Sequence, residues 1–179
     1  MVDRVDGDLM SEEAPRLSEV RRIELLRGSW GLAADVLKAL PSERDLNVMV
    51  DDAYVLKVTN PAEPDAIVEM EVAAMAHVAE ADPDLPVPRT VPDRAGELLH
   101  EITDDTGRRC LVRLITIVPG EMSEGLPIDE DLAEQVGRVT ARMSQALAGF
   151  FHPAAGDAAS TGIRARWVPS PSGAGPPGT

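Results

Sequence analysis

The stretch Tyr54-Val55-Leu56-Lys57-Val58 decides the fold of this chain. It is a short run of β-branched and apolar residues around a single lysine, which predicts a strand that delivers one ammonium group to a defined place. The next run, Pro64–Ala81, predicts a helix, because proline suits the first turn and Asp65 complements the helix dipole there. At 100° per residue, Glu69 falls on the polar face of this helix and Glu71 falls on the apolar face.

A carboxylate on an apolar helix face is costly to bury unless it has a partner. Lys57 on the preceding strand is the obvious candidate, so the sequence predicts an ion pair between Lys57 and Glu71. Protein-kinase-like enzymes use such a strand lysine and helix glutamate to hold the α and β phosphates of ATP. The alternative interpretations are a purely structural ion pair, or a Glu71 side chain that reaches solvent.

The loop before this strand, Leu40–Asn47, joins two further predicted strands, Leu32–Ala39 and Leu46–Val50. Ser42 and Asn47 offer small side chains and a backbone compatible with a turn, which allows close approach to phosphate oxygens. The sequence contains neither a G-x-G-x-x-G loop nor a Walker A motif. Taken alone, this loop is better explained as an ordinary polar hairpin turn.

The rest of the pattern completes an α+β fold. Leu17–Arg27 predicts a short helix, and the prolines of Asp82–Pro88 end the glutamate helix. Glu97–Thr103 and Arg108–Val118 predict strands joined by a hairpin turn. A long amphipathic helix follows, marked by Leu132, Val136, Val139, Met143, Leu147 and Phe150. This order predicts a five-stranded antiparallel sheet with the helices on one side of it.

These motifs in combination resemble a known family. The stretches are Ser42-Glu-Arg-Asp-x-Asn47, Tyr-Val-Leu-Lys57-Val-Thr-Asn60, Glu71 and Leu-Pro-Val-Pro88. Together they resemble the N-terminal lobe of the aminoglycoside phosphotransferase family, nearest its hydroxylysine-kinase-like branch. The resemblance covers roughly Leu17 to Pro153 and implies a protein-kinase-like lobe, followed by the long amphipathic helix and a disordered tail.

The resemblance also implies a nucleotide site for ATP or GTP. In it, Lys57 contacts the nucleotide phosphates and Glu71 orients that lysine. Ser42 and Asn47 lie in the loop that covers the nucleotide. Arg113 and Thr116 belong to the strand and hinge segment Arg113–Gly120, which holds adenine through backbone groups.

The catalytic loop of this family, H-G-D-x-x-x-x-N, is absent from the sequence, because none of His77, His100 and His152 is followed by x-Asp. The later magnesium-binding aspartate of the family is absent as well. We therefore assign no catalytic or metal residue here, and Mg²⁺ is expected only in the full-length family. Full-length members would phosphorylate a hydroxyl of a small amine-bearing molecule, such as hydroxylysine or an aminoglycoside. We expect this chain alone to be inactive, since positioned acid–base groups and metal supply much of such catalysis. The alternative is a non-catalytic nucleotide-binding or interaction module, completed by a partner chain.

The composition divides the chain into three parts: a polar tail at 1–15, the lobe with its linker helix at 16–153, and a tail at 154–179. After Asp157, Pro, Gly and Ser dominate and hydrophobic periodicity stops, which is typical of disorder. We expect a truncation or a frameshift near Gly156; a natural disordered tail is the alternative. The long helix would then lack part of its partner surface, so a missing C-terminal lobe or a homo-oligomer is the expected partner.

The overall charge excludes some classes of partner. The formal net charge is −14, with 31 acidic and 17 basic residues, which argues against nucleic acid and anionic membranes as partners. The single cysteine, Cys110, excludes an internal disulfide and lies in an apolar run that predicts a buried, inert thiol. No apolar stretch approaches the ~20 residues of a membrane span, and the acidic N-terminus lacks a signal core. The expected location is the cytoplasm.

Overall fold

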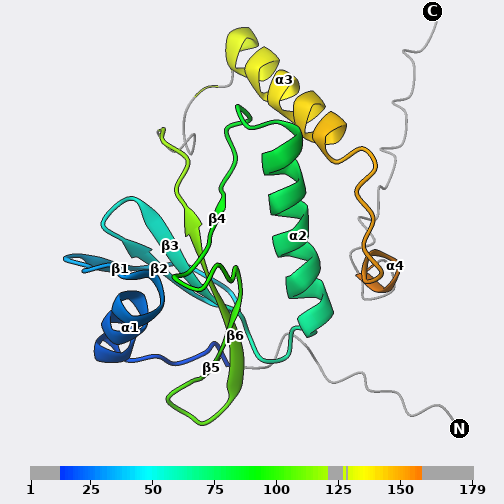
Figure 1. Cartoon of the computed structure of the whole chain (residues 1–179). Helices are drawn as coiled ribbons and strands as arrows, with labels where there is room; N and C mark the ends of the chain where they lie inside the picture. Colours follow the sequence, from blue (N-terminus) through cyan, green and yellow to red (C-terminus); the bar gives the residue numbers. More distant parts are fainter. Residues whose placement is uncertain (1–12, 121–126, 128, 159–179) are drawn as a thin grey trace, which may run out of the picture.

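An antiparallel sheet of six strands forms the centre of the computed structural model, which describes residues 13–120, 127 and 129–158 (Figure 1). The strands are β1 Leu37–Leu40, β2 Leu46–Val50, β3 Tyr54–Val58, β4 Thr90–Val91, β5 His100–Thr103 and β6 Arg109–Thr116. They lie in the order β1-β2-β3-β6-β4, and β5 pairs with the first half of β6. The predicted α+β fold around an antiparallel sheet is confirmed, with one strand more than the five expected, the two-residue β4.

The helices are α1 Glu19–Leu25, α2 Asp65–Ala81, α3 Glu130–Ala146 and the short α4 Ala155–Ala158. A π-helical turn, η1 Leu26–Trp30, continues α1 and ends at Gly31, whose φ of 72° is the left-handed conformation that glycine adopts readily. Asp129 caps α3, because its side chain accepts a hydrogen bond of 2.8 Å from the Leu132 backbone N–H.

The two faces of the sheet have different partners. Side chains alternate along each strand, so Leu56 and Val58 point to one face and Lys57 points to the other. The first face packs against Leu17 and Leu26, which precede and follow α1, and forms the main buried core. Helix α2 covers the opposite face (Figure 1). The prediction of helices on one side only is therefore wrong, because the segment around α1 fills the face away from Lys57.

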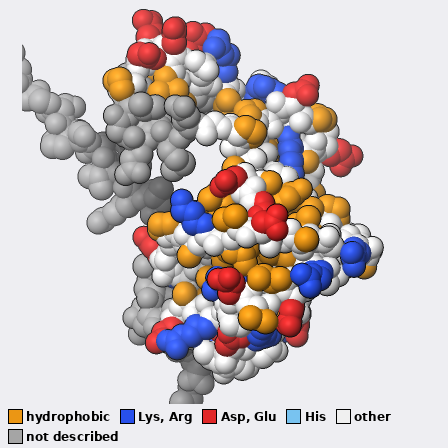
Figure 2. Space-filling model, turned by 90° about the vertical axis from the view of Figure 1, so that its left-hand side faces the viewer, with side chains coloured by type: hydrophobic (Ala, Val, Ile, Leu, Met, Phe, Trp, Pro, Cys, Tyr) orange, Lys and Arg blue, Asp and Glu red, His pale blue; other side chains and the backbone are white. Residues whose placement is uncertain are grey.

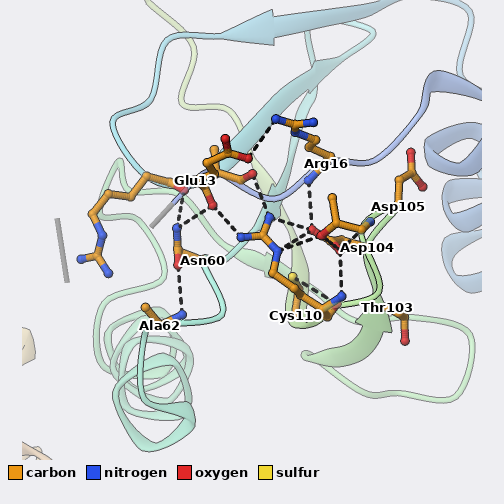
Figure 3. Close-up of polar contacts among 12 residues, drawn as sticks. Glu13, Arg16, Asn60, Ala62, Thr103, Asp104, Asp105 and Cys110 are labelled. Carbon is orange, nitrogen blue, oxygen red and sulfur yellow. Dashed lines mark hydrogen bonds and ion pairs between the residues drawn. The ribbon is translucent and has the colours of Figure 1, made fainter. Parts of the chain in front are cut away.

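The segment before α1 is fastened to the β5–β6 turn by a buried carboxylate, Asp104 (Figure 3). Asp104 accepts hydrogen bonds from the Arg16 backbone N–H and from the Arg108 guanidinium, which also donates to the carbonyl oxygens of Glu13 and Ala14. Part of the predicted N-terminal tail, residues 13–15, is thereby bound to the lobe. The rest of that tail and most of the predicted C-terminal tail lie outside the described residues.

Helix α3 packs against the C-terminal end of α2 through a second, smaller core of Val78, Leu85 and Ala146. Arg142 of α3 also holds Asp82, the residue that ends α2, through two contacts of 2.8 and 2.7 Å. Such a two-pronged pair fixes orientation as well as distance. The predicted helix is present, but it ends at Ala146, before Leu147 and Phe150 of the predicted stripe. Val136 is 57% exposed, while Val139 and Met143 pack against the cluster at the end of the glutamate helix.

Cys110 is fully buried, as predicted, and this burial raises the pKa of its thiol. Figure 2 shows acidic and basic side chains interspersed with hydrophobic ones on one face of the described lobe. Within the described segments, every helix falls short of the length and apolar character that crossing a bilayer requires.

Candidate functional site

The α2 face of the sheet carries two parallel rows of side chains. Strand register places Lys57 directly opposite Asn47 on one side and Arg113 on the other. Val55, two residues earlier, lies opposite Met49 and Ile115 in the same way. Directly opposed residues share a face, and residues two apart in a strand lie about 7 Å from one another. A polar row and an apolar row therefore run side by side across three strands.

Two open cavities meet at the polar row. The first, of about 290 Å³, is mostly polar and is lined by Ser42, Glu43, Arg44, Asp45, Lys57, Thr59, Glu63 and Glu71. The second, of about 360 Å³, is mostly apolar and is lined by Lys57, Ala74, Met75, Val78, Val87, Pro88, Arg113, Ile115, Met143 and Leu147. Lys57 lines both, so its ammonium lies where polar and apolar space join.

The Lys57 ammonium is held by Asp45, at 2.6 Å between Nζ and Oδ2. Asp45 lies in the β1–β2 loop, and its other oxygen accepts a hydrogen bond of 2.9 Å from the Asn60 backbone N–H. Both side chains are largely buried, with 25% of the lysine and 19% of the aspartate exposed. The loop that precedes β2 therefore reaches the lysine through a carboxylate rather than through glycine backbone.

The predicted ion pair between Lys57 and Glu71 is wrong for this structure. Glu71 reaches from α2 toward the sheet and pairs with the guanidinium of Arg113, but its side chain is 48% exposed, so the burial expected from the apolar face is wrong as well. No ion pair joins Lys57 to Glu71 among the described residues. The physical reason is a competing cation on the adjacent strand: Arg113 lies opposite Lys57 on the same face and has a longer side chain.

Several buried polar atoms around the two cavities have no partner within the described part of the chain. They are Asn47 Oδ1, Thr59 Oγ1, Arg44 Nε and Nη2, and Arg113 Nε and Nη1. Buried polar atoms are normally hydrogen-bonded, so each such atom calls for an explanation, and a bound ligand is one. Their concentration around Lys57 marks this place as the candidate site.

The other predicted site residues are placed as follows. Ser42 is exposed in the β1–β2 loop, and its hydroxyl accepts a hydrogen bond of 3.2 Å from the Asp45 backbone N–H. Asn47 lies in β2 itself, as the neighbour of Lys57. Thr116 ends β6 with its side chain on the face away from Lys57, where its hydroxyl accepts a hydrogen bond from the Arg89 backbone N–H at 2.9 Å.

Sequence reasoning missed Asp45 and the side chain of Arg113 as members of this site. A signal for Arg113 was present, because it is a lone cation in the apolar run Cys110–Val118, as Lys57 is in its own strand. The two strands also show the same alternation, which puts both cations on one face once the strands pair. For Asp45 the sequence holds no comparable signal, since its contact depends on how the loop bends.

The linings of the two cavities suit a ligand with one anionic and one apolar end. Among the described residues, no group of three or more His, Cys, Asp or Glu side chains is arranged to hold a metal ion. An ammonium beside partnerless donors suits phosphate oxygens, and the adjacent apolar row suits a flat heterocycle.

Comparison with known proteins agrees with this fold. Residues 36–172 match the phosphotransferase enzyme family, APH. The chain is 29% identical over 164 residues to a hydroxylysine kinase of Bos taurus, which covers 82% of this chain and 44% of that protein. It is 28% identical over 151 residues to a hydroxylysine kinase of Danio rerio, with 79% and 42% covered. The chain thus spans less than half the length of these relatives.

Two solved structures share the fold. One is the amicoumacin kinase hAmiN in complex with AMP-PNP, Ca²⁺ and Ami, with a TM-score of 0.60, 17% identity, and 77% of this chain and 42% of that chain covered. The other is a microcompartment-associated aminopropanol kinase, with a TM-score of 0.55, 20% identity, and 76% and 43% covered. The family match extends over most of the sequence and includes every residue of the two rows, and on that ground the chain belongs to the phosphotransferase enzyme family.

Proposed function

We propose that this lobe binds a nucleoside triphosphate, ATP or GTP, on the α2 face of its sheet. The observation that carries the proposal is the polar row through Lys57, which runs beside the apolar row across the same three strands. The base would lie on the apolar row of Met49, Val55 and Ile115, and the phosphates would lie beside Asn47 and Lys57. The distance of about 7 Å between rows suits a ligand with one apolar and one anionic end.

In this proposal Lys57 contacts the nucleotide phosphates, after the phosphates displace Asp45 from its ammonium. Ser42 and Asn47 border the phosphates from the β1–β2 loop and from β2. Thr116 and its neighbours in the segment 113–120 contribute backbone groups to the base, because the Thr116 side chain is already engaged with Arg89. The nucleotide would supply the phosphoryl group that the family transfers.

The acceptor follows from the relatives only as a class. The similar proteins are kinases of hydroxylysine, amicoumacin and aminopropanol. We propose that the complete activity transfers phosphate to a hydroxyl of a small amine-bearing molecule. The 179 residues contain no H-G-D-x-x-x-x-N motif, so we expect this chain by itself to bind nucleotide without transferring phosphate.

Titration calorimetry of the 179-residue chain with Mg-ATP and Mg-GTP tests the binding. We expect weak binding that Lys57→Ala abolishes, because an ammonium contributes a charged contact to phosphate. Arg27→Ala is the control, since Arg27 is an exposed cation in η1 on the opposite side of the sheet. Absence of nucleotide binding, or binding that Lys57→Ala leaves unchanged, would contradict the proposed site.

A second assay separates a binding lobe from a complete enzyme. Transfer of the γ-phosphoryl group of labelled ATP to hydroxylysine or an aminoglycoside is measured with the 179-residue chain. We expect no transfer above the background without protein. Robust turnover would show that these residues suffice for catalysis and would overturn the interpretation of a binding lobe.

A further inference from the structure

The guanidinium of Arg113 is in an unusual position for a charged group. Its side chain is only 5% exposed, yet Glu71 is its sole partner among the described residues and contacts one nitrogen, Nη2. The other two nitrogens, Nε and Nη1, are buried without a hydrogen-bond partner. Leaving charged donors buried and unpaired is costly, so a stable protein normally supplies an acceptor for them.

The position of Arg113 also places two positive charges opposite each other. Lys57 and Arg113 are directly paired across β3 and β6 and both line the apolar cavity. Like charges at directly opposed strand positions destabilise a sheet. Asp45 and Glu71 each neutralise one of these charges. If a phosphate takes the place of Asp45 at Lys57, its oxygens come next to the second cation.

We infer that the Arg113 side chain is a second phosphate-binding group of the nucleotide site, and this inference rests on the proposed function. Arg113 and Lys57 together hold the phosphates from two adjacent strands. Glu71 then positions the arginine instead of orienting the lysine. The planar guanidinium can donate one N–H to Glu71 while its other N–H groups donate to phosphate oxygens. A lysine ammonium lacks this fixed fork of donors.

The experiment compares ATP with adenosine, which has the base and sugar but no phosphate. Dissociation constants for both are measured by titration calorimetry for the 179-residue wild type and for Arg113→Gln. We expect Arg113→Gln to weaken ATP binding by about 10- to 100-fold, the range for a lost charge-assisted hydrogen bond, and to leave adenosine binding unchanged. Arg113→Lys keeps the charge without the fork and should fall between the two.

The matched control is Arg109→Gln. Arg109 lies on the same strand and face as Arg113, but it is half exposed and pairs with Asp65 and Glu101 away from both cavities rimmed by Lys57. Its ATP and adenosine affinities should match the wild type. Thermal unfolding of each variant shows whether it folds. If Arg113→Gln does not fold, the ratio of ATP to adenosine affinity of Arg113→Lys tests whether Arg113 binds phosphate.

The outcomes separate this inference from the proposed function. One contrary outcome is an unchanged ratio of ATP to adenosine affinity in both Arg113 variants, either because neither affinity falls or because both fall equally. That result overturns the role of Arg113 in phosphate binding, while the nucleotide site stands. A wild type that binds neither ATP nor GTP overturns the proposed function and this inference with it. A selective loss for ATP in the Arg113 variants alone supports both.

Discussion

At the scale of single residues, Asp104 is the most heavily bonded carboxylate described. Its burial would by itself raise the pKa of the carboxyl group. The hydrogen bond from the Thr106 hydroxyl, at 2.6 Å, and those from the Arg108 and Arg16 backbone N–H groups outweigh that effect. The pKa of Asp104 therefore lies well below its ordinary value. A depressed pKa in the folded state means that the charged form contributes to stability.

We expect Asp104→Asn to lower the free energy of unfolding at pH 7 by roughly 3 kcal/mol, because Arg108, whose side chain is 28% exposed, would lose its charged partner. The contribution of Asp104 is fully present above the unfolded-state pKa of about 3.9 and is lost as the pH falls further. Urea unfolding at pH 7, 5, 4 and 3 measures this. Asp35→Asn, at an exposed site, is the control. The mutant should lose less stability between pH 5 and 3 than the wild type; parallel pH profiles would contradict the assignment.

Asp45 offers a prediction about ligand competition. A phosphate that binds Lys57 must displace the Asp45 carboxylate, which lies 2.6 Å from the ammonium. Asp45→Asn should therefore tighten ATP binding about two- to fivefold, which is the worth of a partly exposed ion pair. Glu43→Gln removes the same charge from the same loop but breaks no ion pair in the described residues, and should have a smaller effect on the ATP dissociation constant. Equal effects would indicate net charge alone.

At the scale of elements, the β2–β3 turn holds two non-glycine residues in left-handed conformation, Asp51 at φ 49° and Asp52 at φ 53°. Asp51 has a use for its side chain, which accepts hydrogen bonds from the Asp35 and Val36 backbone N–H groups at 3.0 and 2.7 Å. Asp52 shows no such contact in the described residues. Glycine adopts this conformation with less strain than any other residue.

Asp52→Gly should therefore raise the free energy of unfolding by roughly 0.5 kcal/mol, and Asp52→Ala should lower it. Thermal unfolding of the three proteins at equal concentration is the measurement. If alanine proves as stable as glycine at this site, backbone strain is not what limits the turn.

The elements also show where sequence reasoning succeeds. The strands around Lys57 and the β5–β6 hairpin are set by local alternation and turn residues, and the structure contains them. Two begin later than predicted: β1 at Leu37 instead of Leu32, and β5 at His100 instead of Glu97. Strand β4 was missed because its two residues follow closely spaced prolines and pair only with the distant Leu114 and Ile115. The partner of Lys57 was missed for a related reason. Asp45, Glu71 and Arg113 all reach the neighbourhood of Lys57. Which of them pair depends on strand register and on the shape of the β1–β2 loop, and no local sequence pattern encodes either.

At the scale of the whole molecule, the two packing layers differ in depth. The core between the sheet and the α1 segment contains fully buried residues such as Leu26, Leu56 and Leu114. The layer between α2 and α3 rests on a smaller cluster and on the Asp82–Arg142 pair. Less buried apolar surface means a lower free energy of local opening.

Amide hydrogen exchange should accordingly show two tiers, with α3 exchanging through a partial opening and β3 and β6 only through global unfolding. Arg142→Ala should speed exchange in α3 and leave the strands unchanged. Arg138→Ala, which breaks a pair within α3 alone, is the matched control and should have little effect. Equal protection of α3 and the strands in the wild type would show that the lobe opens as one unit.

The alternation along β6 has a consequence for the gene. Cys110, Val112 and Leu114 face the main core, while Arg113 and Ile115 face α2. Losing or gaining one codon inside this strand would exchange the two faces for all residues on one side of the change. The Arg113 guanidinium would then point toward the core, or the buried Val112 would point toward the cavities. A change of two codons would keep the faces but move Arg113 away from Lys57. We therefore expect natural insertions and deletions to collect in the turns beside β6 and to spare the strand.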